Sequence, residues 1–439
     1  MYDARTPSDR QPINEKIPPE TPLGPEISPA PEAASLARGF LRRYFCWLAL
    51  FLAAGLLILA PYAWLWLAAS GDVDVEGAVD AQARGDFAIF GSGVTQDFAD
   101  YKLRLYARIR PEITALGSSR VMQFRGAWFS ESFLNMGGAA GNISMLAATA
   151  RAMLEIHRPR IAIIGIDFWW FLPQWEKNPH RRHVFEDNPY NYGAASLRRP
   201  WQWLLEGKIS PAEFAAPLLG LAGHGFRAAR YGIMAQRTDD GFGPDGSWYY
   251  TGETTGKSKP WDFRFEDTLM LVERGIKAFY HAPADSAAPS RSHLEAFADI
   301  YYYLLARGVK VYVFIPPLAG PVLAAMSQRP EAYAHLFHLR EALAAMDIDA
   351  LDLSDPRLLA SGDCEFVDGF HGGEVTYARI LRALADHWPS LLAVVRMPEL
   401  NAIIRDWQGN AQVPDVRVTS LPETDFMRFG CNKKVRQGD

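Results

Sequence analysis

Cysteine is scarce in this sequence, with three residues among 439. Cys46 lies within an apolar run, which leaves Cys364 and Cys431 as the only pair that could close a disulfide in an oxidising compartment. Spacing alone leaves open whether these two thiols meet or stay free. No cysteine spacing matches a zinc or redox motif, so we predict no metal site.

The sequence also has no excess of positive charge, since its net charge is −5 at pH 7. This argues against a global basic field of the kind that binds nucleic acid, and we expect no nucleic-acid partner. Aromatic residues are frequent, at 13%. Such a content suits a polymer substrate, although most buried aromatic side chains belong to a core.

Charged residues are missing between Arg43 and Asp72. Residues 44–67 are apolar, and about 20 apolar residues are enough for a helix to cross a membrane. Aromatic residues suited to the membrane interfaces lie toward both ends of the run, at Tyr44, Trp47, Tyr62, Trp64 and Trp66. We predict a transmembrane helix over 44–67. A buried core helix seldom runs this long, and a cleaved signal peptide is shorter and starts earlier.

The charges that flank this helix predict its orientation. Arginines precede it and acidic residues follow it, at Arg38, Arg42, Arg43, Asp72, Asp74, Glu76 and Asp80. The positive-inside rule then places the N-terminus in the cytoplasm and the main domain outside. The first 35 residues hold eight prolines, so we predict that residues 1–43 are a disordered cytoplasmic tail.

Residues 111–397 alternate between strand and helix patterns. We expect buried strands at 113–116, 133–136, 161–166, 309–315 and 350–353, and helices at 143–157, 292–307, 331–346 and 374–387. This alternation predicts a parallel sheet covered on both faces, an α/β/α three-layer sandwich. An aromatic and irregular insertion at about 168–290 interrupts the pattern. Residues 68–110 are predicted to form a juxtamembrane connector with a short amphipathic helix near 97–108, and residues 398–439 a loosely ordered tail.

Ligands of parallel sheets bind outside the carboxyl ends of the strands. The first strand ends in Gly117-Ser118-Ser119, where glycine permits a sharp turn and a serine can present its hydroxyl. The second strand leads into a stretch rich in glycine and alanine at 135–142, which leaves room for a ligand oxygen beside backbone N–H groups. The third ends at Asp167, and an Asp-x-x-His precedes the last helix.

The order of these motifs resembles the SGNH (GDSL-like) hydrolase superfamily over roughly residues 111–390, with the insertion unmatched. The nearest likeness is to its membrane-anchored branch, which includes the alginate O-acetyltransferase type and the D-alanyl-lipoteichoic acid transfer protein. The resemblance implies a flavodoxin-like sheet and a periplasmic domain, with no cofactor. It also implies that Ser119 is the nucleophile, with Ser118 as the fallback, that His371 is the general base, and that Asp368 orients its imidazole.

The resemblance implies an oxyanion hole formed by the Ser119 N–H with Gly137 or Gly138. The sequence departs from the family where an asparagine is expected after the third strand, because Asp167 stands there. An ionised carboxylate cannot donate to an oxyanion. Asn142 can replace the missing donor, as can Asn135, which fits better as the residue that fixes the turn. Asp167 is then free to pair with Arg120 or Arg125.

Two further features bear on substrate binding. Trp169 and Trp170 follow the third strand, where they would either stack on sugar rings or cap the sheet with apolar surface. His180-Arg181-Arg182-His183 is a basic cluster that fits a solvated loop better than a polymer or metal site. We therefore name Arg120, Asp167, Trp169 and Trp170 as substrate-binding candidates.

These features together favour a membrane-anchored acyl-ester transferase or esterase acting on an extracytoplasmic polysaccharide or cell-wall polymer. O-acetylation is the preferred reaction, since the anchor would hold the site near a membrane acyl donor. The resemblance implies a membrane-bound O-acyltransferase as that donor. The alternative is a non-catalytic module of the same fold that binds polymer or organises a biosynthetic complex.

Overall fold

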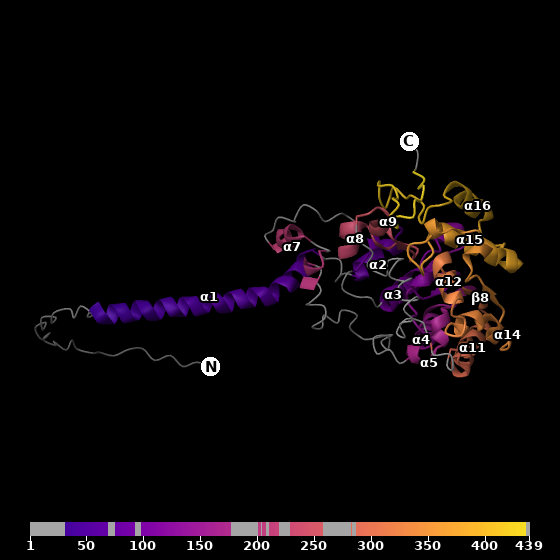
Figure 1. The fold of residues 1–439 in the computed structure, drawn as a ribbon, viewed down its shortest axis with the longest axis horizontal. Helices are drawn as coiled ribbons and strands as arrows, with labels where there is room; N and C mark the ends of the chain where they lie inside the picture. The colour runs from indigo at the N-terminus through magenta and orange to yellow at the C-terminus, as the bar shows by residue number, and fades with distance from the viewer. Residues whose placement is uncertain are drawn as a thin grey trace, which may run out of the picture. The chain divides into compact units, whose positions relative to one another are not determined.

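A long helix and a larger α/β unit make up the computed structural model (Figure 1), which describes residues 31–68, 75–92, 98–176, 201–202, 204–207, 210–218, 229–257, 282 and 287–435. The chain divides into two units, Met1–Leu59 and Ala60–Asp439. The basic cluster at 180–183 lies outside the described residues.

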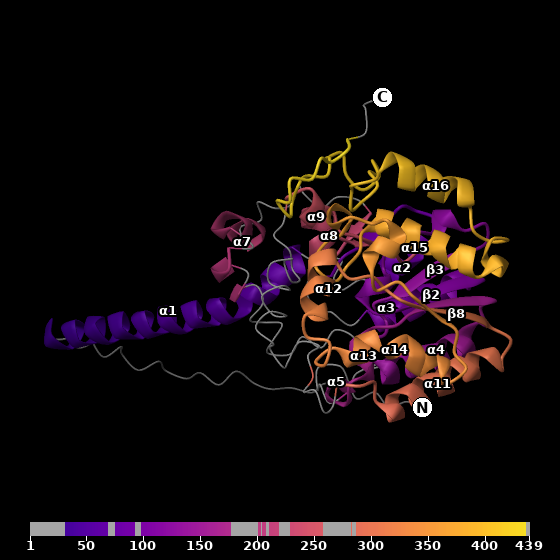
Figure 2. The same cartoon turned by 45° about the vertical axis from the view of Figure 1, so that its right-hand side comes forward.

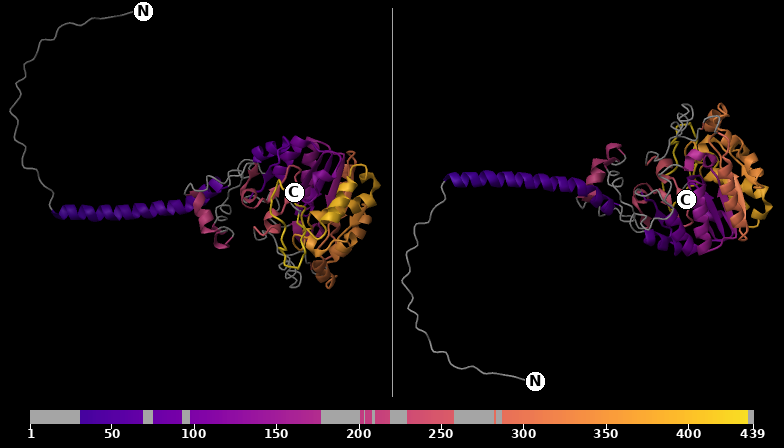
Figure 3. Two further views of the ribbon diagram at one scale, coloured as in Figure 1. Left: turned by 90° about the horizontal axis from the view of Figure 1, so that it is seen from above. Right: turned by 90° about the horizontal axis from the view of Figure 1, so that it is seen from below.

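Helix α1 (Pro31–Ala68) is continuous in both views of Figure 3. Its segment Arg38–Leu59 is long and apolar enough to cross a membrane, and none of this segment is buried in the protein. This confirms one N-terminal helix of spanning length, although the segment starts before the predicted residue 44. The predicted disordered tail differs from the structure from Pro31 onward. Proline suits the first turn of a helix, and the alanines that follow favour helix. Residues 1–30 lie outside the described part of the chain.

Five parallel strands form the main sheet, in the order β3-β2-β4-β8-β9. They are β2 (Ile113–Gly117), β3 (Phe133–Gly137), β4 (Ile161–Gly165), β8 (Lys310–Ile315) and β9 (Ala350–Asp352). The predicted parallel sheet is confirmed, with each strand within two residues of its expected bounds. Numbered along the chain, the strand order is 2-1-3-4-5. The chain adds β3 on one side of β2 and the later strands on the other, so the topological switch point lies between β2 and β4.

Alternate side chains of the sheet enter two separate apolar clusters, because successive residues of a strand point to opposite faces. On β4, Ala162 and Ile164 pack with residues of α3 (Ala99–Ile109), α4 (Ile143–Ile156) and α11 (Arg291–Leu305). Ile161 and Ile163 pack with residues of α15 (Glu374–His387) and α16 (Met397–Asp406). Figure 2 shows α15 and α16 on one side of β2, β3 and β8, and α4 and α11 on the other.

The helices after β8 differ in part from the prediction. Helix α15 has the predicted bounds, and α12 (Gly320–Ser327) was not expected. The helix predicted at 331–346 is divided into α13 (Ala334–Phe337) and α14 (Leu339–Ala344). His338 separates them, because its backbone, with φ −110° and ψ 7°, is not helical.

The predicted connector is built into the larger unit. It holds α2 (Val75–Ala83), β1 (Ile89–Phe90) and α3, which matches the expected amphipathic helix. Gln82 of α2 donates to Phe242 O at 2.9 Å and accepts from the Tyr101 hydroxyl at 2.7 Å. The apolar positions of α2 and α3 join the core, which the short and interrupted pattern did not reveal.

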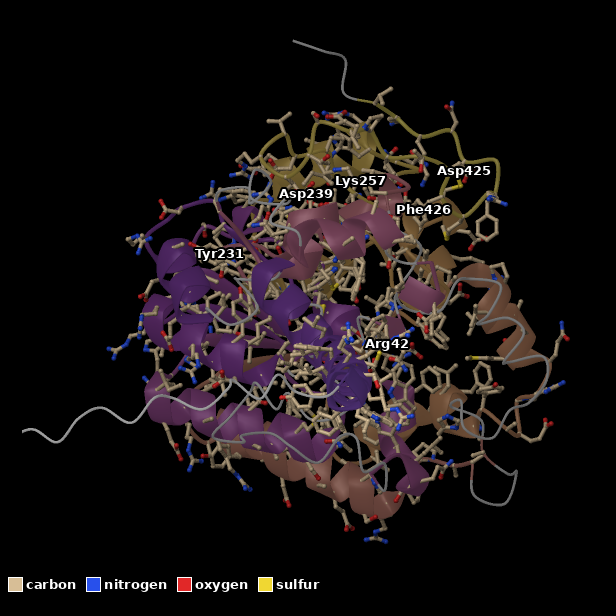
Figure 4. All side chains as sticks on the ribbon, turned by 90° about the vertical axis from the view of Figure 1, so that its left-hand side faces the viewer. Arg42, Tyr231, Asp239, Lys257, Asp425 and Phe426 are labelled. Atoms are coloured by element: carbon tan, nitrogen blue, oxygen red, sulfur yellow. A yellow bond between two sulfur atoms is a disulfide. The ribbon has the colours of Figure 1, made fainter. Side chains whose placement is uncertain are left out.

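The described part of the insertion forms a second, small sheet around β1. Its order is β5-β1-β6-β7, with β5 (Arg230–Tyr231), β6 (Gly241–Phe242) and β7 (Trp248–Tyr249). The insertion also contains α5 (Pro173–Glu176), α7 (Pro211–Leu218), α8 (Ile233–Thr238) and α9 (Thr251–Thr254). Asp239 at the end of α8 pairs with Arg230 at 2.8 Å and with Lys257 at 3.1 Å (Figure 4).

The C-terminal segment is more ordered than predicted. It begins with α16, and Cys431 is joined to Cys364 by a disulfide across 67 residues. Glu423 is buried, pairs with Lys433 at 2.6 Å and accepts from the backbone N–H groups of residues 411 and 412. Lys433 also lies 5.3 Å from the ring centre of Phe426. The ion pair, the hydrogen bonds and the disulfide leave no apolar periodicity in the sequence, so the order of this segment could not be predicted from it.

Candidate functional site

Ser119 lies at the carboxyl end of β2, where the chain turns sharply into the short 3-10 helix η2 (Ser119–Val121). Gly117 makes this turn with φ +151°, and a Cβ there would lie 2.4 Å from Val121 Cγ2. No other residue fits this position without displacing its neighbours. Ser118 caps the turn by accepting from the Arg120 N–H at 3.1 Å. The Ser118 hydroxyl is therefore occupied locally, and the half-buried Ser119 is the serine that faces the site.

Asp368 and His371 lie in the loop that precedes α15. One carboxylate oxygen of Asp368 accepts from the backbone N–H groups of Phe370 and His371, at 2.7 and 2.8 Å. The other oxygen lies 2.7 Å from His371 Nδ1. Asp368 thus fixes both the backbone of the loop and the orientation of the imidazole ring.

The Ser119 Oγ atom lies 2.8 Å from His371 Nε2. Because an ionised carboxylate only accepts hydrogen bonds, Nδ1 carries the imidazole proton and Nε2 is left to accept from the serine hydroxyl. The three side chains therefore form one continuous chain of hydrogen bonds. This geometry has what a serine needs for activation as a nucleophile, namely an adjacent base that is held by a third group.

The two glycines named as oxyanion donors have their N–H groups occupied. The Gly137 N–H donates to Asn135 Oδ1 at 2.7 Å, and the Gly138 N–H donates to the carbonyl oxygens of Gly117 and Ser118, each at 3.0 Å. Asn135 also donates to the carbonyl oxygens of Val121, the last residue of η2, and of Phe124, so it fixes the turn. The prediction that Gly137 or Gly138 donates to the oxyanion is corrected, because both N–H groups already donate to acceptors at the strand ends.

Two other donors of this region stay open. The Ser119 N–H donates no backbone hydrogen bond among the described residues. Asn142 caps α4, since its Oδ1 accepts from the Met145 N–H at 2.7 Å. Its Nδ2 makes no hydrogen bond within the part of the chain that the structure describes. The Ala140 N–H donates to Gly117 O, which ties the Asn142 loop to the turn that carries Ser119.

The four substrate-binding candidates are all buried. Arg120 and Asp167 form an ion pair at 3.3 Å, with each side chain 1% exposed. The predicted arginine partner of Asp167 is therefore Arg120. Trp169 and Trp170 lie in η4 (Phe168–Phe171), and Trp169 packs edge-on against Phe370. The apolar-cap alternative fits both tryptophans better than sugar stacking does, because their faces are covered.

Sequence reasoning missed a second arginine contact and one aromatic neighbour. Arg125 donates to Glu374, the first residue of α15, at 3.1 Å, and burial raises the pKa of Glu374 while Arg125 opposes that rise. The Tyr250 ring lies 6.3 Å from the His371 ring. Tyr250 comes from the insertion, where no motif or periodicity marked it.

The sequence matches none of the models of known protein families, and it matches no curated protein. The proposed function therefore rests on the arrangement of Ser119, Asp368 and His371.

Proposed function

We propose that this chain is a membrane-anchored, serine-dependent acyl-ester transferase or esterase with an SGNH-like three-layer α/β/α domain. The hydrogen-bonded series Ser119–His371–Asp368 carries the proposal. The strand order 2-1-3-4-5 supports a flavodoxin-like sheet, and the serine lies at the carboxyl ends of its strands, where ligands of such sheets bind. A half-buried serine beside a held imidazole suits catalysis better than packing.

The geometry supports a two-step reaction. The Ser119 Oγ attacks the carbonyl carbon of an acyl ester, and its proton passes to His371 Nε2. The ester C–O bond breaks, and the leaving alkoxide takes that proton. In the second step an acceptor hydroxyl attacks the acyl-enzyme and gives its proton to His371. The Ser119 ester bond then breaks, and Ser119 Oγ takes that proton from His371 Nε2, which restores the free enzyme. A sugar hydroxyl as acceptor makes the protein a transferase, whereas water makes it an esterase.

The negative charge that develops on the acyl oxygen needs hydrogen-bond donors. The open Ser119 N–H is one, and we assign the Asn142 amide as the second. Asp167 takes no part in this role, because its charge is committed to Arg120. The hole is then built from one backbone and one side-chain donor.

The setting proposed for this reaction is outside the cytoplasm. Helix α1 supplies the anchor, and the charges around it favour a cytoplasmic N-terminus. The disulfide between Cys364 and Cys431 suits an oxidising compartment such as the periplasm. We propose a carbohydrate polymer as the acceptor, O-acetylation as the reaction and a membrane-bound O-acyltransferase as the partner that supplies the acyl group.

A serine-directed fluorophosphonate probe tests the proposal on the full chain in detergent micelles. We expect covalent labelling of the wild type and loss of labelling in Ser119→Ala. Ser118→Ala is the matched control, because Ser118 only caps the turn, and it should keep labelling. Labelling that persists in Ser119→Ala, or that is absent from the wild type, would reject Ser119 as an activated nucleophile.

The alternative function is a non-catalytic module that binds polymer or organises a biosynthetic complex. Two observations favour it: Asp167 stands where the resemblance expects a donor, and the Gly137 and Gly138 amides are occupied. This alternative predicts no acyl transfer or ester hydrolysis, together with retained polymer binding in Ser119→Ala. Turnover of an acetyl ester that depends on Ser119 would exclude it.

A further inference from the structure

Arg120 directly follows the proposed nucleophile, and its side chain is buried. Its Nε donates to Phe370 O at 3.0 Å, and its Nη2 donates to the carbonyl oxygens of Pro316 and Pro317, at 2.9 and 2.8 Å. Its Nη1 lies 3.3 Å from Asp167 Oδ1. These acceptors follow β4, follow β8 and precede α15, so one guanidinium joins three loops to the turn after β2.

The Arg120–Phe370 hydrogen bond runs beside the Ser119–His371 contact. Arg120 is one residue after Ser119, and Phe370 is one residue before His371. Any shift of the base-bearing loop relative to the serine turn must therefore stretch the hydrogen bond of Arg120 to Phe370 as well. A displacement of about 1 Å can slow catalysis about 100-fold. The Arg120–Phe370 hydrogen bond therefore bears on the distance between Ser119 and His371.

Burial of the guanidinium requires a compensating charge. Asp167 provides a carboxylate, and the Trp169 ring adds a cation–π contact with its centre 5.3 Å from the guanidinium carbon. An asparagine at this position would offer an oxygen but no charge. A buried cation left without its carboxylate is strongly unfavourable. The charge requirement of the buried Arg120 side chain thus explains why position 167 holds an aspartate and not an asparagine.

We infer that Arg120, held by Asp167, is a positioning residue that sets the His371 loop against Ser119. The inference rests on the proposed function. Arg120 is covered by protein, so it acts through His371 and does not touch the acyl substrate. Asp167, which stands where the resemblance expects an asparagine, then holds Arg120 in place and does not donate to the oxyanion.

The test measures the two constants of fluorophosphonate labelling, the maximal rate kinact and the half-saturating concentration KI, on the full chain in micelles. Arg120→Lys and Asp167→Asn should lower kinact about 10- to 100-fold, with KI unchanged. Arg120→Met should lower it further, and the lysine, which keeps the charge and some donors, should recover part of the rate. Melting temperature is recorded for each variant.

Arg379→Lys is the matched control. Arg379 is also buried and pairs with Glu365 through two hydrogen bonds, at 2.9 and 3.0 Å. Within the described part of the chain, it makes no hydrogen bond to Ser119 or His371. This variant should lower the melting temperature and leave kinact within about twofold, as expected for a purely structural ion pair.

Several outcomes overturn the inference. One is a wild-type kinact in Arg120→Lys and Asp167→Asn, and another is an equal loss of kinact in Arg379→Lys. A loss that appears only in KI also rejects it, because a buried positioning residue does not bind the probe. If Arg120→Met does not fold, Arg120→Lys and Asp167→Asn decide. If the wild type is not labelled, the proposed function and this inference both fail. If the wild type is labelled and the Arg120 variants keep its kinact, only this inference fails.

Discussion

The proposed function gives the two ends of the Asn142 amide different roles. Its oxygen caps α4 through the Met145 N–H, and that hydrogen bond fixes the direction of its Nδ2. A donor held in this way loses little freedom when an oxyanion forms, which is the condition for efficient electrostatic stabilisation. In the proposed reaction, helix capping and oxyanion stabilisation therefore depend on the same side chain.

Asn142→Asp separates these two uses. Aspartate is an equally good cap, so α4 should keep its stability, while the carboxylate cannot donate to the oxyanion. We expect kcat for hydrolysis of a small acetyl ester to fall about 100- to 1,000-fold, the effect of losing one oxyanion donor. Steady-state kinetics and thermal melting measure the two effects independently.

Asn142→Ala is the comparison for this prediction. It removes the cap together with the donor, and loss of the cap should cost about 1 kcal/mol of stability. If Asn142→Asp retains wild-type kcat, Asn142 is a cap alone and the second donor must be sought elsewhere.

At the scale of elements, the sequence predicts the strands and helices that apolar residues mark by their spacing. Buried runs and a 3.6-residue period predict the five strands and α15. Ser119, Asp368 and His371 lie in motifs at strand and helix ends, and the resemblance to the SGNH superfamily singles them out. The roles of these three side chains remain predictions. The sheet order accounts for the place of Ser119, and the loop before α15 brings Asp368 and His371 to it. Parallel strands bring their carboxyl ends to one edge whatever their separation along the chain.

Contacts made by polar atoms could not be predicted in the same way. Occupation of the Gly137 amide depends on how the Asn135 side chain folds back. The strands of the small sheet are two residues each, too short to show a period. The tail after α16 is held by Glu423, Lys433 and a disulfide, none of which leaves a periodic signal.

The disulfide makes the C-terminal segment a testable element. Because it closes a loop of 67 residues, Cys431→Ser should lower the free energy of unfolding by about 2–4 kcal/mol. The segment after α16 should also become more sensitive to limited proteolysis. Denaturant unfolding followed by tryptophan fluorescence measures the first effect, and mass spectrometry of the fragments measures the second.

Cys46→Ser is the control, since Cys46 is a free and exposed cysteine of α1. It should leave both measurements unchanged. A Cys431→Ser variant that is as stable and as protease-resistant as the wild type would show that the ion pair of Glu423 and Lys433 is sufficient to hold the segment.

For the whole molecule, the decisive property is the side of the membrane on which the α/β unit lies. Arginines before the span and acidic residues after it predict that the C-terminus is outside the cytoplasm. A C-terminal alkaline phosphatase fusion should therefore be active in bacterial cells, whereas a C-terminal green fluorescent protein exported through the Sec pathway should be dark. The reverse pattern would contradict the orientation and the oxidising setting of the disulfide.

The order of the site along the chain also has a consequence for biosynthesis. Ser119 precedes His371 by 252 residues, and Cys431, which closes the last loop, comes later still. During synthesis the anchor and the serine emerge first, when no imidazole is present to accept the serine proton. A nascent or prematurely terminated chain thus carries the serine without its base. Under the proposed function, such a chain has no activated serine until the segment with Asp368 and His371 has been made.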